Sequence, residues 1–175
     1  NAAAPAGNSP VPSAEEITSE LLNADVNIKV MGYLRCIREV VPHMKRQGWG
    51  RIVNISGLAA RRTGNTIGSI RNVAVVAMTK NLGDELGPHG INVNSIHPGM
   101  TRTERTPGMF EARASRDGIT VAEAEAQMAA GNSVRRVIDA EDIANVVAFL
   151  VSPKSSAING DIIAAGGGDP GVIHY

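Results

Sequence analysis

The chain has 175 residues, which is enough for a single domain, residues 1–175, with a sizeable core. Its 17 Lys and Arg residues balance its 17 Asp and Glu residues, and this neutrality argues against a nucleic-acid or anionic-membrane partner. Hydrophobic residues make up 43% of the chain and charged residues 19%, a composition typical of globular proteins and not of disordered ones.

The numbers and spacing of the cysteine and histidine residues bear on the cellular compartment and on metal binding. The single cysteine, Cys36, has no partner for a disulfide within the chain, which favours a reducing compartment and a cytoplasmic location. The four histidines have no metal-ligand spacing, so we expect no metal site. No apolar run approaches the length of a membrane span, and the first residues lack the basic and apolar regions of a signal peptide.

The N-terminal part predicts a loop followed by helices. Residues 1–12 are rich in Ala, Pro, Gly and Ser, as loops are. Ser13 and Glu16 have the spacing of a capping box, which predicts a short helix from Ser13. A longer helix is predicted over 24–47 and ends at Gly48. Its apolar residues recur at three- and four-residue steps: Val26, Val30, Leu34, Ile37, Val41 and Met44.

The middle of the chain predicts two strands with a helix between them. Residues 51–56 and 91–96 are rich in β-branched residues and predict strands. The helix begins between residues 66 and 72 and ends near residue 87 at Gly-Pro. Five of its residues share one face: Val75, Met78, Thr79, Leu82 and Leu86.

The C-terminal part is predicted to begin with a loop over 100–119, where charges of both signs alternate. A second capping box, Thr120 with Glu123, predicts a helix to about residue 130. Asp139 caps a further helix and has Asp142 at its N3 position. Residues 160–165 predict a third strand. We expect residues 104–130 to form a mobile lid.

Three short apolar strands separated by helices predict an α/β fold. Its core is a three-layer, doubly wound parallel sheet of the Rossmann type. Such sheets bind ligands outside the carboxyl ends of their strands. Here two of those ends are residues 55–57 and 96–99, so we expect a site there.

Several segments in order resemble the short-chain dehydrogenase/reductase family. "DVN" at 25–27 is similar to its helix-embedded asparagine, and "GRIVNISG" at 50–57 to its fifth strand and serine region. "INVNSIHPGMTRT" at 91–103 resembles the sixth strand and the Pro-Gly loop. The opening Asn-Ala-Ala resembles the end of the Asn-Asn-Ala-Gly motif, and residues 139–168 resemble the last helix and strand.

The resemblance implies binding of NAD or NADP. By position, it assigns cofactor contacts to these residues: Asn1, Ala2, Asn72, Pro98, Gly99, Thr101 and Thr103. The Gly-rich dinucleotide fingerprint of the family is absent. In the family it precedes everything found here, and we expect about the first third of a parent protein to be missing from this sequence. The residue that selects NAD or NADP would lie in the same part.

A second departure concerns proton transfer. Family members carry Tyr-x-x-x-Lys at the start of the helix that follows the serine region. Alignment of "AVVAMTK" without gaps places Gly68 at the tyrosine and Asn72 at the lysine. Glycine cannot supply a proton, and an asparagine cannot shift a pKa by charge. The site is therefore expected to be altered.

Three residues remain as catalytic candidates. Asn27 matches the family asparagine, or else it only shapes its helix. Ser56 is a surviving hydroxyl at a strand end, although the family serine more often aligns with Gly57. Arg71 is either a fixed cation beside an oxyanion or a surface or intersubunit arginine.

Two functions follow from these residues. The first is an NAD(P)(H)-dependent oxidoreductase that acts on a small carbonyl or alcohol substrate with an altered catalytic site. The second is a catalytically silent relative that binds nucleotide or assembles with partners. In either case we expect a homo-oligomer, a dimer or tetramer, formed through the helices 24–47 and 66–87. Small residues off the core stripe would allow the helices to approach: Ala74, Ala77 and Gly83.

Overall fold

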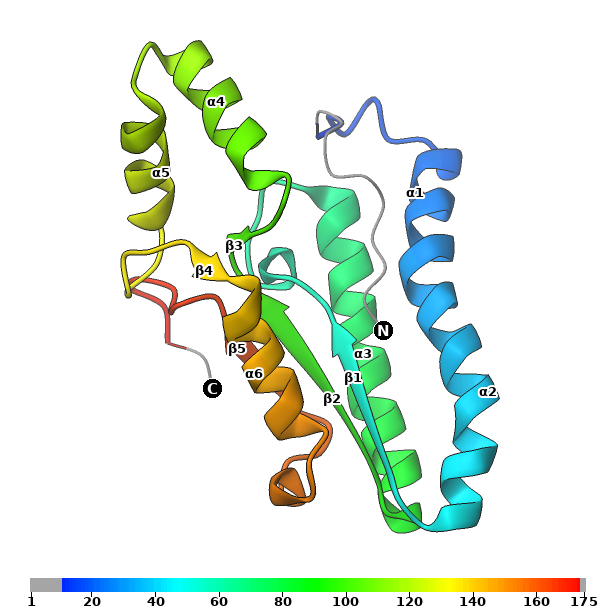
Figure 1. The fold of residues 1–175 in the computed structure, drawn as a ribbon. Coiled ribbons are helices and arrows are strands. Elements are labelled where there is room, and N and C mark those ends of the chain that lie inside the picture. Colours follow the sequence, from blue (N-terminus) through cyan, green and yellow to red (C-terminus); the bar gives the residue numbers. More distant parts are fainter. Residues whose placement is uncertain (1–10, 174–175) are drawn as a thin grey trace. The chain divides into compact units, whose positions relative to one another are not determined.

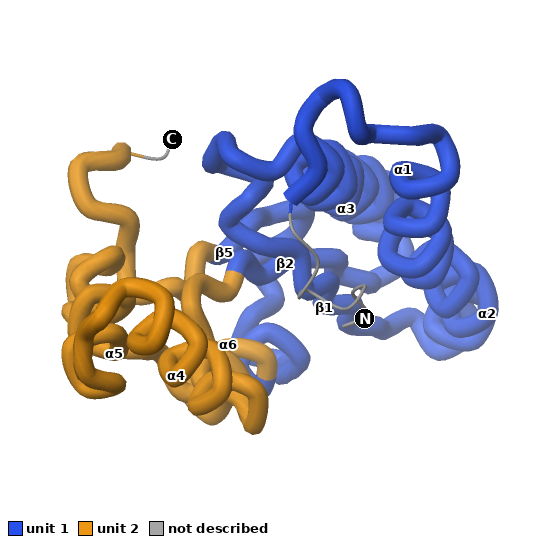
Figure 2. Tube along the Cα trace, turned by 90° about the horizontal axis from the view of Figure 1, so that it is seen from above, with its two compact units in different colours: residues 1–97, 148–163 blue, residues 98–147, 164–175 orange. Residues whose placement is uncertain are grey.

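The computed structural model describes residues 11–173, so the predicted cofactor contacts of Asn1 and Ala2 lie outside the described residues. The chain divides into two compact units (Figure 2). Unit 1 comprises residues 1–97 and 148–163, and unit 2 comprises residues 98–147 and 164–175. Each unit is described by itself below.

A three-stranded sheet confirms the predicted strands (Figure 1). The strands are β1 (Gly50–Ile55), β2 (Ile91–Pro98) and β5 (Ile162–Ala165), in the order β1-β2-β5. β1 and β2 run parallel, with Gly50 opposite Ile91 and Ile55 opposite Ile96. Residues 91–97 of β2 are all buried, as expected for a central strand of a parallel sheet.

The predicted helix over 24–47 is longer and less regular than expected. It begins with α1 (Ser19–Val26), passes through the π-helical turn η1 (Asn27–Met31) and continues as α2 (Gly32–Gln47). Gly48 closes it in the left-handed conformation. α3 (Thr66–Leu86) confirms the second predicted helix, and the single turns η2 (Leu58–Ala60), η3 (Gly87–His89) and η4 (Pro153–Ser155) complete unit 1.

The short helix expected from Ser13 is absent. The Ser13 backbone N–H does donate to Glu16 Oε2 at 2.8 Å, as in a capping box, but residues 14–16 form only a turn. Thr18 then adopts an extended conformation, and its hydroxyl accepts from the backbone N–H of Leu21. The helix therefore starts after Thr18, because an extended residue cannot continue a helical turn.

The core of unit 1 lies between α2, α3 and one face of the sheet. Its buried residues come from α2, α3, β1 and β2: Tyr33, Ile37, Ile52, Val75, Leu86, Ile91 and Val93. Met78 and Leu82 of the predicted stripe pack against this cluster. Apolar burial on this face fixes the helices to the sheet and so positions the end of β1 beside α3.

Gly83 of α3 packs closely against another backbone segment of unit 1. It is buried, and a Cβ built on it would lie 2.8 Å from Gly160 Cα and 2.9 Å from Gly160 N. It therefore allows α3 to approach the backbone before β5 within unit 1.

Between residues 100 and 130, unit 2 contains two helices where one was predicted. Besides α5 (Val121–Ala129), which opens with the expected Thr120–Glu123 capping box, α4 spans Thr106–Asp117. The predicted loop over 100–119 is therefore wrong for most of its length. Phe110 and Ala114, one turn apart, are buried and anchor α4 among its charged residues.

Two short strands, β3 (Thr101–Arg102) and β4 (Ile138–Asp139), pair in parallel within unit 2. α6 (Ala140–Leu150) follows, and the Asp139 N–H donates to Asp142 Oδ2 at 3.0 Å, as the sequence predicts for its N-terminus. Phe110, Ala129 and Val137 form the buried cluster of this unit with Met100 and Met128 against it. Across residues 11–173, no helix combines the length and the apolar character that a membrane crossing requires.

Candidate functional site

A buried lysine stands at the end of β1. Lys29 lies in the π-helical turn η1 and is only 4% exposed. Its Nζ donates to the Ser56 carbonyl oxygen at 2.9 Å and to Asn72 Oδ1 at 3.0 Å. The ammonium therefore occupies the surroundings of the residue that aligns with the family lysine, but it reaches them from a different helix.

Tyr33 lies four residues after Lys29 and is also buried. Its hydroxyl donates to the Ile55 carbonyl oxygen at 2.9 Å. Two consecutive carbonyls that end β1, those of Ile55 and Ser56, thus receive the tyrosine hydroxyl and the lysine ammonium. This pairing aligns the helix with the strand end and fixes where the Lys29 head group lies.

The two residues that accept from the Lys29 ammonium, Ser56 and Asn72, are neutral and also contact each other. The Ser56 hydroxyl donates to the Asn72 backbone carbonyl at 3.1 Å, and both residues are buried. A Cβ at Gly57 would lie 3.1 Å from Asn72 Nδ2, so the glycine leaves room around this amide. Ser56 and Asn72, chosen from the sequence for different roles, are therefore brought together around Lys29.

The surroundings disfavour the charged form of Lys29. The pKa of Lys29 is lowered from 10.5 to about 8, chiefly by burial and also by the Arg71 guanidinium, while the Asp25 carboxylate acts in the opposite direction. A lysine with a pKa near 8 exchanges its proton readily close to neutral pH, which an exposed lysine does not. Chemically, the cluster holds a proton donor next to backbone and amide acceptors.

Arg71, the third catalytic candidate, contacts Asp25. Its Nη1 lies 2.7 Å from Asp25 Oδ1, and the two side chains are 17% and 15% exposed. This ion pair joins α3 to α1 beside the Lys29 cluster. Arg71 is thus neither a solvated surface arginine nor directly bonded to Lys29.

Asn27 and Gly68 lie at the margins of this cluster. Asn27 is exposed, and its Oδ1 accepts from Arg35 Nη2 at 2.6 Å. Gly68 is buried in the first turn of α3, where its N–H donates to Asn65 Oδ1 at 2.8 Å. A Cβ at position 68 would lie 2.8–3.0 Å from the Asn65 side chain, so the N-cap of α3 occupies the space beside the glycine.

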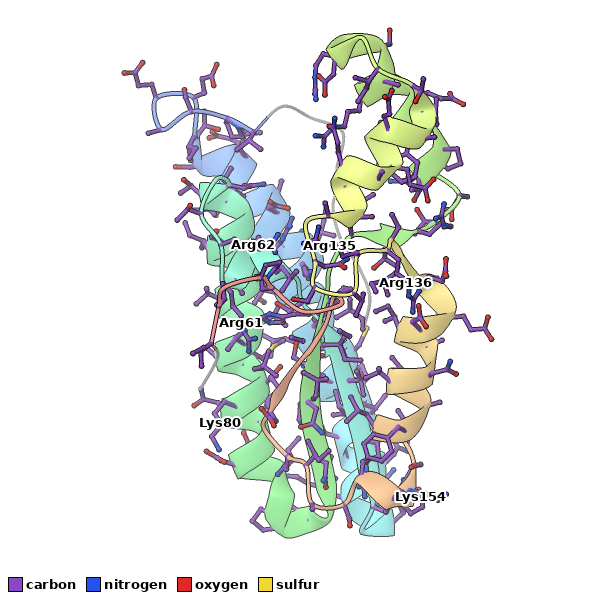
Figure 3. The ribbon with its side chains drawn as sticks, turned by 90° about the vertical axis from the view of Figure 1, so that its left-hand side faces the viewer. Arg61, Arg62, Lys80, Arg135, Arg136 and Lys154 are labelled. Carbon is purple, nitrogen blue, oxygen red and sulfur yellow. The ribbon has the colours of Figure 1, made fainter. Side chains whose placement is uncertain are left out.

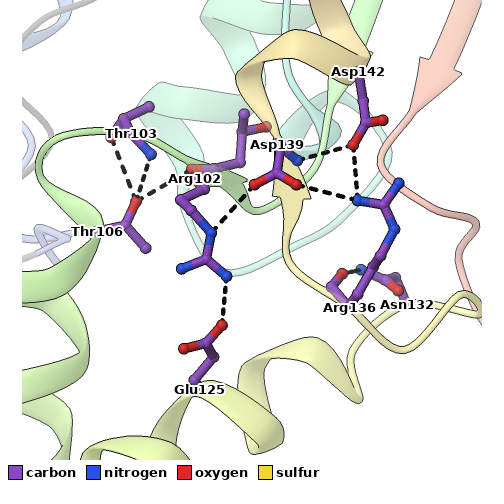
Figure 4. Close-up of polar contacts among 9 residues, drawn as sticks. Arg102, Thr103, Thr106, Glu125, Asn132, Arg136, Asp139 and Asp142 are labelled. Atoms are coloured by element: carbon purple, nitrogen blue, oxygen red, sulfur yellow. Dashed lines mark hydrogen bonds and ion pairs between the residues drawn. The ribbon is translucent and has the colours of Figure 1, made fainter.

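The Pro-Gly loop belongs to unit 2 and is internally bonded. A Cβ at Gly99 would lie 2.7 Å from Gly166 Cα, which explains the glycine that follows Pro98. The Thr101 hydroxyl donates to the Gly99 carbonyl at 3.1 Å. Thr103 Oγ1 accepts from the Arg105 N–H at 3.4 Å. The Thr103 N–H donates to Thr106 Oγ1 (Figure 4). The cofactor role of this loop stays a prediction.

A network of exposed charges also lies in unit 2 (Figure 4). Arg102 contacts Glu125 and Asp139, and Arg136 contacts Asp139 and Asp142. All of these residues except Asp142 border an open cavity of about 480 Å³, which three alanines of α5 also line. Carboxylates raise the pKa of Arg102 and Arg136, so both stay charged and neither is a proton donor.

Lys29 is buried, whereas many of the Lys and Arg residues are exposed. Six of these are labelled in Figure 3, and all are exposed: Arg61, Arg62, Lys80, Arg135, Arg136 and Lys154. Within residues 11–173, no group of three or more His, Cys, Asp or Glu side chains is arranged to hold a metal ion.

Sequence reasoning missed Lys29 and Tyr33. The signal that could have found them is their spacing with Ile37, because residues 29, 33 and 37 recur every four positions and all three are buried. A lysine at the centre of an apolar helix face requires buried partners, and this marks it as a candidate site residue.

Comparison with known proteins agrees with this fold. The family model described as enoyl-(acyl carrier protein) reductase matches residues 1–169. The NADPH-dependent reductase BacG of Bacillus subtilis is 34% identical over 151 residues, covering 85% of this chain and 58% of BacG. The short-chain reductase protein NovJ of Streptomyces niveus is 37% identical over 147 residues, covering 83% of this chain and 54% of NovJ.

Solved structures give the same result. The crystal structure of YwfH, an NADPH-dependent reductase involved in bacilysin biosynthesis, has a TM-score of 0.83 and 32% identity, and the match covers 95% of this chain and 66% of YwfH. L-sorbose reductase from Gluconobacter frateurii, 23% identical over 97% of this chain and 65% of its own, matches in fold with a TM-score of 0.87. The chain spans little more than half the length of the curated relatives named above. It has a Rossmann-like α/β fold and belongs to the short-chain dehydrogenase/reductase family.

Proposed function

We propose that this chain carries the proton-transfer site of an NAD(P)(H)-dependent oxidoreductase that reduces a small carbonyl compound, with Lys29 as the proton donor. The observation that carries the proposal is the buried Lys29 ammonium, held by the Ser56 carbonyl and the Asn72 amide at the carboxyl end of β1. Parallel α/β sheets bind their ligands outside this end of the strands.

The chemistry requires such a donor. A bound reduced nicotinamide would supply the hydride, and the oxygen of the reduced carbonyl then needs a proton. A positioned acid whose pKa lies near the working pH serves best in this step. Lys29, with its pKa lowered to about 8, meets this condition, and neither Gly68 nor Asn72 does. The neutral amine that remains is protonated again by water.

The donor set around Lys29 also fits a nicotinamide ribose. Two Nζ hydrogens are used by Ser56 and Asn72, and an ammonium carries a third. Asn72 Nδ2 makes no hydrogen bond within residues 11–173, and Gly57 leaves space beside it. Asn72 would therefore hold a ribose hydroxyl through Nδ2, and the third Nζ hydrogen of Lys29 stays free to pass to the substrate oxygen. The NADPH-dependent reductases among the relatives favour NADPH over NADH.

The test is reduction of a panel of aldehydes and ketones by the protein that contains this chain, followed as NADPH and NADH consumption. Lys29→Met should lower kcat by about two to four powers of ten, the usual contribution of a positioned acid. Lys45→Met, which removes an exposed lysine of α2, is the matched control and should leave kcat unchanged. Retained cofactor binding and an unchanged unfolding midpoint in Lys29→Met would separate lost chemistry from lost structure. Full activity in a folded Lys29→Met protein would overturn the proposal.

A second function, nucleotide binding without turnover, is favoured by one observation. Lys29 is almost fully enclosed, and two of its hydrogens are already bonded to the protein. This candidate predicts tight NADPH binding and no substrate-dependent NADPH consumption across the panel. Assembly as a dimer or tetramer through α2 and α3 stays a prediction in both cases, and light scattering measures it.

A further inference from the structure

We propose that the Asp25–Arg71 ion pair is the positioning pair of Lys29, which holds its ammonium on Asn72 and controls how readily it gives up its proton. The inference deepens the proposed function and rests on it for its consequence in catalysis. It gives Arg71 a role other than direct contact with a reacting oxyanion.

Two neighbouring side-chain contacts join the α1–η1 segment to α3. Asp25 and Lys29 are four residues apart on the α1–η1 segment, and Arg71 and Asn72 are neighbours on α3. Arg71 Nη1 contacts Asp25 Oδ1 at 2.7 Å, and Lys29 Nζ contacts Asn72 Oδ1 at 3.0 Å. The ion pair therefore fixes the separation and the rotation of the helices that carry Lys29 and its acceptor.

The partners of Arg71 leave it little freedom. Its Nε is buried and makes no hydrogen bond in the described part of the chain, so Asp25 supplies the contact that holds the guanidinium. Loss of Asp25 would leave a half-buried cation without an anion next to a second cation. Loss of Arg71 would leave a carboxylate that attracts the Lys29 ammonium away from Asn72.

Both members of the pair act on Lys29 through a low-dielectric region. The Arg71 charge disfavours the ammonium and the Asp25 charge favours it. The two groups that Lys29 Nζ contacts, the Ser56 carbonyl and the Asn72 amide, are neutral, and the Tyr33 hydroxyl from α2 donates to the neighbouring Ile55 carbonyl. While the pair is intact the two charges largely offset each other.

The experiment is an NMR titration of the Lys29 side chain in the protein that contains this chain, with Lys29→Met to assign the resonance. Asp25→Asn should lower the proton affinity of Lys29 by roughly three- to tenfold, and Arg71→Gln should raise it by a similar factor. The double variant, Asp25→Asn with Arg71→Gln, should return it close to the original value. If the pair only joins the helices, both single variants should lower stability without changing the proton affinity of Lys29 in opposite directions.

The exposed Lys80–Asp84 pair, with contacting atoms 2.7 Å apart, is the matched control. Asp84→Asn should change the Lys80 titration far less, because solvent screens exposed charges. Failure of both single variants to move the Lys29 titration would overturn the inference whatever the enzymatic result. If the two single variants change the proton affinity of Lys29 in opposite directions and Lys29→Met keeps full activity, the inference about the ion pair stands and only the proposed function is rejected.

Discussion

Lys29 in unit 1 and Arg102 in unit 2 represent two ways of placing a cation in this fold. Lys29 is buried among neutral acceptors, a carbonyl and an amide. Arg102 is exposed and contacts two carboxylates, Glu125 and Asp139. The pKa of Lys29 is lowered to about 8, whereas the pKa of Arg102 is raised. Desolvation without a contacting anion produces a titratable group, and ion pairing in solvent produces a permanent charge.

The contrast between the two cations distinguishes a residue suited to proton transfer from residues that only form surface ion pairs. An exposed ion pair contributes little to stability, since solvent screens it and ordering its side chains costs entropy. A buried ammonium with neutral partners is costly to fold, so its presence requires some other advantage. Proton transfer near neutral pH is the advantage that we propose for Lys29.

The largest effect is expected when a second cation is placed beside Lys29. Asn72→Lys removes an acceptor of the ammonium and adds a like charge in a buried place. We expect a loss of about 3–5 kcal/mol in the free energy of unfolding, measured by denaturant titration. Asn72→Asp is the control, because its carboxylate would pair with Lys29. Glu125→Lys, the corresponding like-charge change at Arg102 in unit 2, should have a much smaller effect. Equal effects at the two places would contradict the comparison.

The pH dependence of stability gives the next largest effect. Lys29 binds its proton more weakly in the folded state, with a pKa of about 8, than at its ordinary value of 10.5. Between these values the unfolded chain binds more protons, so stability rises as the pH rises through this window. The gain is on the order of 3 kcal/mol, and below pH 8 the cost of the buried charge is constant. Lys29→Met should lack this rise in denaturation measured across the window, and Arg102→Met should keep it.

Substitution of one glycine in each unit should have the smallest effect on stability, and it tests whether the two units are packed equally densely around these glycines. Gly83→Ala in unit 1 places a Cβ 2.8 Å from the Gly160 backbone and should cost about 1–3 kcal/mol in the free energy of unfolding. Gly108→Ala in unit 2 meets no atom within 4 Å, and it should stabilise α4 by up to about 1 kcal/mol. Calorimetry or denaturant titration of both variants measures the contrast. Destabilisation by Gly108→Ala would show hidden packing in unit 2.

The sequence predicted the elements whose signals are local. Thr120 with Glu123 and Asp139 with Asp142 make the capping contacts expected from their spacing. The β-branched runs of β1 and β2 form the predicted parallel strands. α4 was missed because Phe110 and Ala114 are its only strong apolar anchors among many charged residues, and such a pattern does not differ from that of a loop.

The site was harder to predict because its contacts are distant in sequence. Ser56 and Asn72 were found through the family resemblance, but Lys29 lies 27 and 43 residues away from them. Arg71 pairs with Asp25 across 46 residues, which local spacing cannot show. The predicted stripe is confirmed at four positions, because Ile37 is in the core cluster and Val30, Val41 and Met44 pack against it. Lys29 and Tyr33, which the stripe left out, are buried as well.

The π-helical turn η1, between α1 and α2, makes the length of this segment as important as its composition. A π turn accommodates one more residue than an α-helical turn does. Deletion of a single residue between Asn27 and Met31 would restore regular helix and rotate α1 by about 100° relative to α2. All the other side chains would be retained, and yet Asp25 would no longer face Arg71. Relatives that differ here by one inserted or deleted residue would therefore have a different site, even where each aligned residue is identical.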